Sequence, residues 1–147
     1  MRTHVTFQAG FPKEGTPDAP AGQALAQHLA AQLGAAGYTT EPPQVHEGYA
    51  YQFGCRQDRN AFAVFTALVD DGVQEWLVYA EPKVAAVGRL LQKVGIGGSG
   101  NADSPALGAL CTAINTALRS DPGVRSIRWY TTEGWDENPD GDWSRTP

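Results

Sequence analysis

The stretch from residue 49 to residue 80 constrains the fold most strongly, because it holds three successive strand patterns joined by tight turns. Alternating apolar and polar residues over Tyr49–Cys55 are typical of a half-buried strand. Ala61–Val69 is almost continuously apolar, which predicts a central strand covered on both faces. Asp70-Asp71-Gly72 then signals a hairpin into a third strand over Val73–Ala80. The sequence therefore predicts a three-stranded antiparallel meander.

Further elements flank this meander on both sides. The sequence predicts a strand and a helix before it, then two helices and a strand after it, at Thr3–Ala9, 20–36, 83–94, 105–120 and Val124–Thr131. The third helix has the clearest start, with Ser104 in the capping position and Pro105 in the first turn. Asp18 is a candidate cap for the first helix.

The predicted order β-α-β-β-β-α-α-β favours an α+β fold, because strict alternation of strands and helices is absent. We expect a single two-layer domain over residues 1–130, with a mainly antiparallel sheet of about five strands and helices on one face. Residues 131–147 form a separate C-terminal tail in this interpretation. A chain of 147 residues is long enough for one such core and too short for two ordinary ones.

The tail differs from the rest of the chain in its charge. Residues 1–130 carry 11 acids and 10 bases, whereas residues 131–147 carry five acids and one base, so most of the net charge of −5 lies in the tail. Two of the four tryptophans are there as well. We predict that the tail contacts a partner, through Glu133, Trp135, Asp136, Glu137, Asp140 and Trp143. Because the body is nearly neutral, we expect electrostatic steering to come from the tail alone.

Two segments resemble ligand-binding motifs, and each has a plainer interpretation. The glycine-rich stretch 95–100 follows a helix pattern and lacks the Lys and Ser/Thr of a phosphate loop, so a linker or recognition loop is favoured. Asp136–Gly141 matches the first half of a calcium-binding loop, but Pro147 stands where the bidentate Glu should be. We interpret this second segment as a surface turn and predict no metal site.

No catalytic constellation is evident in the sequence. His4, His28 and His46 lack the spacing of a zinc site. Cys55 and Cys111 each lie in an apolar pattern, so we expect two reduced core thiols. The chain has no G-x-S-x-G elbow, and its neighbouring carboxylates fall in hairpin turns, where acids are usually solvated. We predict a protein without catalytic residues or cofactor.

Composition also narrows the compartment and the partners. No run of about 18 apolar residues is present, and the N-terminus lacks the apolar stretch of a secretory signal, which favours a cytoplasmic protein if Met1 is the natural start. The net charge of −5 argues against non-specific binding of nucleic acid or of an anionic membrane. A basic protein partner is compatible with that charge. The oligomeric state is left open.

Aromatic residues in the strand patterns offer an alternative site. If they gathered on one side of the sheet, they could line a pocket for a small molecule, as in a regulatory module. Packing of the same residues between sheet and helices is the plainer interpretation, because aromatics favour strands. The residues concerned are Tyr49, Tyr51, Trp76, Tyr79, Trp129 and Tyr130.

Several short blocks together resemble a group of small, uncharacterised bacterial cytoplasmic proteins. The blocks are Ala21-Gly22-Gln23-Ala24-Leu25-Ala26, Gly37-Tyr38, Glu41-Pro42-Pro43, 48–53 (GYAYQF), 75–79 (EWLVY) and Ile127-Arg128-Trp129-Tyr130. This resemblance carries over no catalytic residue. In size, acidity and aromatic content the chain is also similar in type to immunity proteins that neutralise bacterial toxins. The function that we predict is therefore a non-catalytic inhibitor of immunity or antitoxin type that binds a basic toxin or effector domain.

Overall fold

The computed structural model describes residues 1–13, 19–83 and 104–147. The glycine-rich stretch, Asp18 and all but the first residue of the helix predicted over 83–94 lie outside these described residues. The α+β class predicted from the sequence is confirmed, with a mainly antiparallel sheet. No helix in the described ranges has both the length and the apolar character needed to cross a membrane.

Within the described ranges the sheet has seven strands, and every pair of neighbours there is antiparallel. The strands are β1 (His4–Gln8), β2 (Thr39–Thr40), β3 (Gln44–His46), β4 (Ala50–Gln57), β5 (Asn60–Asp70), β6 (Glu75–Pro82) and β7 (Arg125–Tyr130). Their order across the sheet is β2-β4-β5-β6-β1-β7. Strand β3 also pairs with β4, at the end opposite to the one that β2 pairs with. The predicted meander is present as β4, β5 and β6, with β5 covered on both faces.

The expected number of about five strands was too low, because β2 and β3 fall in a segment that the sequence analysis left irregular. These strands contain two and three residues, too few to show an alternating pattern. Pro42 and Pro43 lie between them and cannot donate ladder hydrogen bonds. Both strands are short edge segments that pair only with β4.

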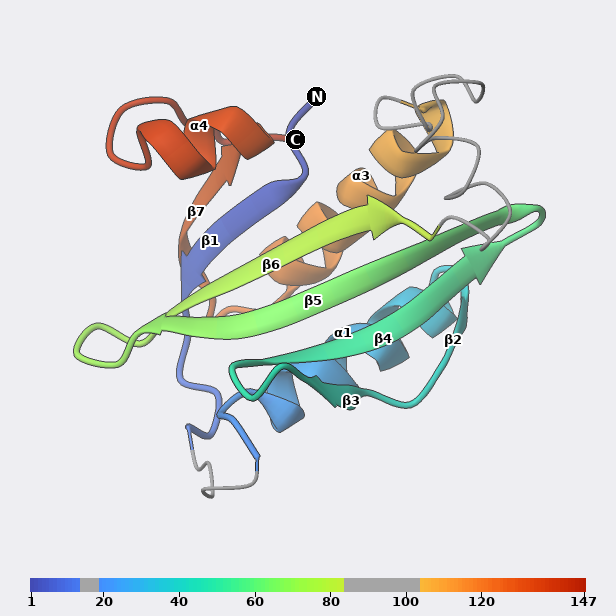
Figure 1. The fold of residues 1–147 in the computed structure, drawn as a ribbon, viewed down its shortest axis with the longest axis horizontal. Helices are drawn as coiled ribbons and strands as arrows, with labels where there is room; N and C mark the ends of the chain where they lie inside the picture. The colour runs from blue at the N-terminus through green and yellow to red at the C-terminus, as the bar shows by residue number, and fades with distance from the viewer. Residues whose placement is uncertain (14–18, 84–103) are drawn as a thin grey trace.

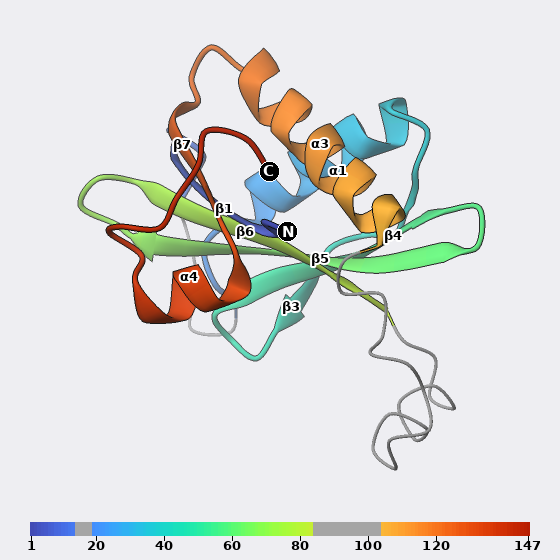
Figure 2. The same ribbon diagram turned by 90° about the horizontal axis from the view of Figure 1, so that it is seen from above.

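Two long helices, α1 (Gln23–Ala35) and α3 (Pro105–Ser120), cover one face of the sheet (Figures 1 and 2). The predicted cap of α3 is confirmed, because Ser104 Oγ accepts a hydrogen bond from the Leu107 N–H at 3.1 Å. Gly22 caps α1 with φ of +110°, and a Cβ there would lie 3.1 Å from the Trp76 ring. Only glycine combines this backbone conformation with such close packing.

The core lies between these helices and the sheet. The leucine stripe of α1 and the apolar face of α3 pack against the inward side chains of β1, β4, β5 and β6. Trp76 is fully buried, and its indole N–H donates to the Ala9 carbonyl at 3.0 Å. Cys55 and Cys111 are free and buried, as predicted, and burial raises the pKa of each thiol to about 12. Neutral thiols of this kind are poor nucleophiles.

The C-terminal segment folds back on the sheet edge. A short helix, α4 (Thr132–Glu137), follows β7 directly and lies on the side of the sheet opposite α1 and α3 (Figure 2). The chain then reverses, and Ser144 forms an isolated antiparallel bridge with Trp129 of β7, with both backbone hydrogen bonds at 2.7–2.8 Å. Residues 131–147 are therefore held against β7 at two points.

Candidate functional site

Helix α4 holds the acidic residues of the C-terminal segment in a defined arrangement. Thr131 caps it, with its hydroxyl accepting from the Gly134 N–H at 2.9 Å. Gly134 is buried, and a Cβ at this position would lie 3.0 Å from Thr131 Oγ1 and 3.3 Å from the Asp142 carbonyl oxygen. Glycine at residue 134 therefore lets the turn that follows α4 pack closely on the helix.

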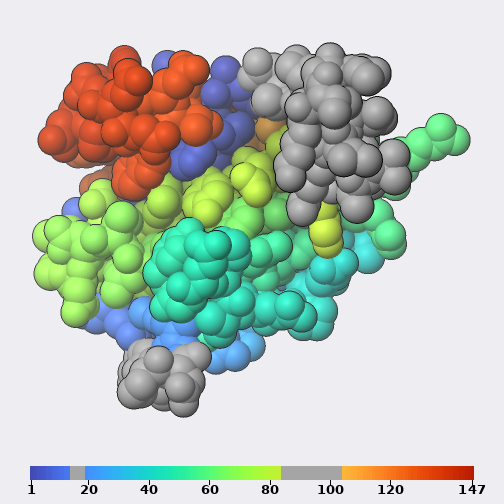
Figure 3. Space-filling model, viewed as in Figure 1, coloured from blue at the N-terminus to red at the C-terminus, as the bar shows by residue number. Residues whose placement is uncertain are grey.

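The carboxylates of this segment are exposed and have no ion-pair partner in the part of the chain that the structure describes. No hydrogen bond or ion pair joins any of their side-chain oxygens to another of the described residues. We call this group the acidic surface; it consists of Glu133, Asp136, Glu137, Asp140 and Asp142. Figure 3 shows the C-terminal segment at one end of the sheet face opposite the helices. The acidic surface thus presents five negative charges on a short, anchored stretch of chain.

The two tryptophans of the predicted contact set lie in different surroundings. Trp135 is partly buried and meets Tyr130 edge to face, with ring centroids 5.5 Å apart. Trp143 is 39% exposed and has the Arg128 guanidinium 5.0 Å above its ring. Trp135 lies on α4, whereas Trp143 lies beside Arg128 of β7. Four of the six predicted residues share α4, and Asp140 and Trp143 lie after it.

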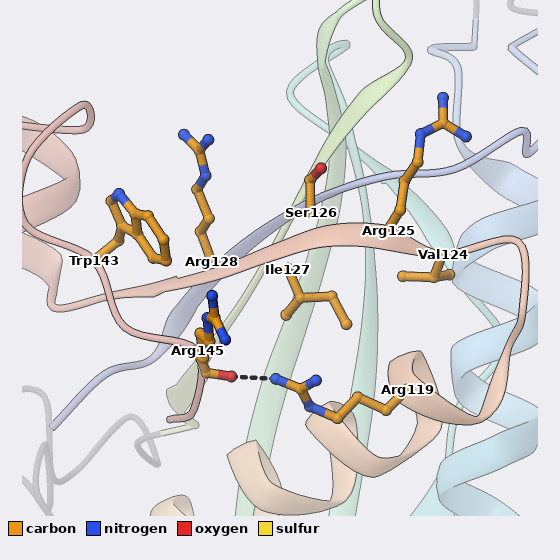
Figure 4. Close-up of a pocket in the computed structure, with 8 residues that line it drawn as sticks. All are labelled: Arg119, Val124, Arg125, Ser126, Ile127, Arg128, Trp143 and Arg145. Carbon is orange, nitrogen blue, oxygen red and sulfur yellow. Dashed lines mark hydrogen bonds between the residues drawn. The ribbon is translucent and has the colours of Figure 1, made fainter.

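A pocket of about 400 Å³ lies along the outer edge of β7, and its lining is strongly basic (Figure 4). Its basic side chains come from the end of α3, from β7 and from the segment after Ser144. We call it the arginine pocket; it is lined by Arg119, Val124, Arg125, Ser126, Ile127, Arg128, Trp143 and Arg145. The linear sequence gives no signal of this site, because the four arginines are spread over 27 residues and are mixed with acids.

A bulge in β7 places two of these arginines on the same face. Thr6 pairs with Arg128 and Gln8 with Arg125, so two residues of β7 stand opposite Phe7. Without the extra residue, side chains three positions apart in a strand would point to opposite faces. Ser126 absorbs the irregularity with φ of +59°, a left-handed conformation that is costly for a non-glycine residue. Figure 4 shows both arginines on one side of β7.

Neutral groups hold three of the four arginines. Arg119 Nε donates to Asn115 Oδ1 at 3.3 Å, and its Nη2 donates to the Arg145 carbonyl. Arg125 Nε donates to Gln8 Oε1 at 3.2 Å, and Arg128 stacks on Trp143. No carboxylate among the described residues lies within ion-pair distance of any of the four guanidinium groups. The pocket therefore carries four positive charges, and no described carboxylate is paired with them.

The sheet face opposite the helices also carries a row of aromatic rings. Cross-strand pairing aligns Phe65, Tyr79 and His4, and their rings stack with centroids 4.5 Å and 5.0 Å apart. Burial lowers the pKa of His4 below its ordinary value of 6.5, and the Asp136 carboxylate partly offsets this effect. Burial is also the main cause that raises the pKa of Tyr79, with a hydrogen bond to Tyr49 contributing.

The six aromatic residues considered for a small-molecule pocket are divided between the two faces of the sheet. Tyr51, Trp76 and Trp129 are buried in the core against the helices. Tyr79 and Tyr130 lie on the other side of the sheet, and Tyr49 lies in the turn before β4. These six side chains therefore do not line one common pocket.

The segment that resembled a calcium loop has a different structure. Asp136 and Glu137 belong to α4, and Asn138–Asp142 form the turn that follows it. Across the described ranges, no three His, Cys, Asp or Glu side chains gather in a way that could hold a metal ion.

Comparison of the chain with protein-family models, with curated proteins and with solved structures gave no match.

Proposed function

We propose that this chain is a non-catalytic protein-binding protein, of the kind that neutralises a toxin in the cytoplasm, and that its acidic surface is the contact. One observation carries the proposal: five exposed carboxylates without ion-pair partners among the described residues stand on a segment fixed to β7 at both ends. Carboxylates that already had cationic neighbours would gain little from a basic partner. Unpaired carboxylates on a fixed support gain Coulomb energy and lose little conformational entropy.

Electrostatics of this kind act first on the rate of association. Complementary charges raise the association rate constant from about 10⁵–10⁶ to as much as 10⁸–10⁹ M⁻¹s⁻¹ at low salt. A rapid inhibitor suits a toxin, because the toxin acts until it is bound. Trp135 lies within the same segment and is only partly buried, so it supplies an aromatic anchor of the type that is enriched in interfaces.

The test is direct binding to a defined basic protein. The product of the gene next to this one, if it encodes a toxin or secreted effector domain, is purified and titrated against the full chain. The triple variant E133Q/D136N/E137Q removes three charges from the acidic surface. A matched control, E41Q/D58N/D71N, removes three exposed charges elsewhere on the described surface.

We expect the surface variant to bind at least about tenfold more slowly at low salt, and the control to stay within about twofold of the parent. High salt should abolish the difference, because the Debye length shrinks to about 3 Å at 1 M. Equal association rates for parent and surface variant would rule out the acidic surface as the contact. A partner that binds the surface variant as tightly as the parent would do the same.

The small-molecule alternative has less support in the structure. Its aromatic residues are divided between two faces of the sheet. The pocket that borders His4 and Tyr79 has a volume of about 190 Å³, whereas ligand pockets usually measure about 300–1,000 Å³. Binding of a partner at the acidic surface needs no cavity at all.

A further inference from the structure

We propose that the arginine pocket binds the phosphate groups of a small, multiply charged ligand. This pocket lies beside the acidic surface, and the proposal does not depend on the function proposed above for the acidic surface. Support for this ligand class comes in four parts: the local charge, the aim of the side chains, their preorganisation and the size of the pocket.

Local charge is the first part. The whole chain has a net charge of −5, yet four of the chain's 11 Lys and Arg side chains line this pocket. Within the described residues these guanidinium groups have no carboxylate partner. Four positive charges around one pocket repel one another, and a bound anion would reduce that repulsion. The negative net charge argues against binding of extended polyanions, but it is compatible with a local site for a compact anion.

The aim of the side chains is the second part. Arg125 and Arg128 lie on one side of β7, while Arg119 and the backbone of Arg145 lie on the other (Figure 4). The bulge at Ser126 is what gives the first two arginines a common side. A serine in the left-handed region costs free energy, and such strain concentrates at ligand sites. The residues that line the pocket therefore include arginines on both sides of β7.

Preorganisation is the third part. Asn115 and Gln8 accept hydrogen bonds from the Nε atoms of Arg119 and Arg125, which restricts the positions of these two side chains. The Arg128 guanidinium lies over the Trp143 ring. A guanidinium whose position is already fixed loses less entropy when it forms a paired hydrogen bond to a phosphate. The neutral character of the supports leaves the positive charge for a ligand.

Pocket size and neighbours define the ligand class. A volume of about 400 Å³ falls in the range of small-molecule sites and exceeds the needs of a single inorganic ion. Val124, Ile127 and the Trp143 ring add apolar surface for an uncharged part of the ligand. The acidic surface stands on the same C-terminal segment and would repel a long polyanion that extended beyond the pocket. A phosphorylated small molecule therefore fits better than a nucleic acid strand.

Calorimetric titration of the full chain with pyrophosphate, at constant ionic strength, tests this inference. The double variant R125Q/R145Q removes two charges from the pocket. The matched control, R56Q/R59Q, removes two exposed arginine charges that lie outside the pocket. We expect saturable binding by the parent, a loss of at least about tenfold in the pocket variant and less than about twofold in the control. R145Q alone serves if the double variant unfolds, because that side chain donates no hydrogen bond to any other described residue.

Three results would overturn the proposal. One is the absence of saturable pyrophosphate binding by the folded parent. Another is an equal loss in the pocket variant and in the control, which would show that only net charge matters. The third is tighter binding of a 20-nucleotide single strand than of pyrophosphate with the same dependence on Arg125 and Arg145, which would make the site a nucleic-acid contact. None of these three results would bear on the proposed toxin binding, because the toxin-binding experiment changes other residues.

Discussion

The acidic surface and the arginine pocket come from neighbouring parts of the chain and have opposite charge. The five carboxylates of the acidic surface lie on α4 and the turn after it, while the pocket is built around β7 and the end of α3. The bridge between Trp129 and Ser144 separates the two, because it returns the chain to the outer edge of β7. Charge summed over a window of sequence therefore hides two sites of opposite sign.

The same comparison corrects the expectation that electrostatic steering comes from the tail alone. The body is nearly neutral as a sum, but three of its ten basic Lys and Arg residues line one pocket and Arg145 joins them from the tail. In the described structure these groups lack acidic partners. Local fields depend on where side chains gather in space, and the sum over a segment does not report this.

Trp129 supports both sites, so its replacement should have the largest effect. It is fully buried, its indole N–H donates to Asn115 Oδ1 at 3.0 Å and its backbone pairs with Ser144. Trp129→Ala should lower the free energy of unfolding by about 3–5 kcal/mol, measured by urea denaturation. Trp143→Ala, at a half-exposed position, is the control, with an expected loss of about 1 kcal/mol. Similar losses in the two variants would show that Trp129 does not anchor this edge.

The opposite fields around Trp135 and Trp143 should be visible in fluorescence quenching. Iodide should concentrate near the arginines and caesium near the carboxylates, whereas the other two tryptophans are fully buried and shielded from both ions. Trp143→Phe should therefore remove most of the iodide-sensitive emission and Trp135→Phe most of the caesium-sensitive emission, each by at least about twofold over the other variant. The same loss with both quenchers would show that the two indoles share one electrostatic environment.

How much of this could be predicted from the sequence depends on the range of the interactions involved. The meander and the Ser104 cap follow from local patterns, and both were predicted correctly. The bulge at Ser126 has no local signal such as glycine, because pairing with β1 imposes it. The separation of Trp143 from Trp135 depends on a chain reversal whose packing involves Gly134 and Asp142. Sites assembled by such long-range pairing are not visible in a linear pattern.

A pH-dependent effect should link the acidic surface to the sheet. Burial lowers the pKa of His4 in the folded state, so the unfolded chain binds the proton more tightly. Stability should therefore be unaffected by His4 above pH 6.5 and should fall as the pH drops below that value. Asp136→Asn should lower the pKa of His4 further, because the carboxylate stabilises the charged imidazole. NMR titration of His4 measures this, and an unchanged titration would show that Asp136 does not act on it.

The smallest effect should come from Ser126, which belongs to the arginine pocket alone. A left-handed conformation costs an L-residue about 1–2 kcal/mol, and glycine avoids this at an entropic cost of about 0.5–1 kcal/mol. Ser126→Gly should therefore raise the free energy of unfolding by about 0.5 kcal/mol, while affinity for pyrophosphate stays the same or falls as the bulge loosens. Urea denaturation and calorimetry on the same protein measure both quantities. Higher stability together with tighter pyrophosphate binding would mean that the serine conformation does not serve to aim Arg125.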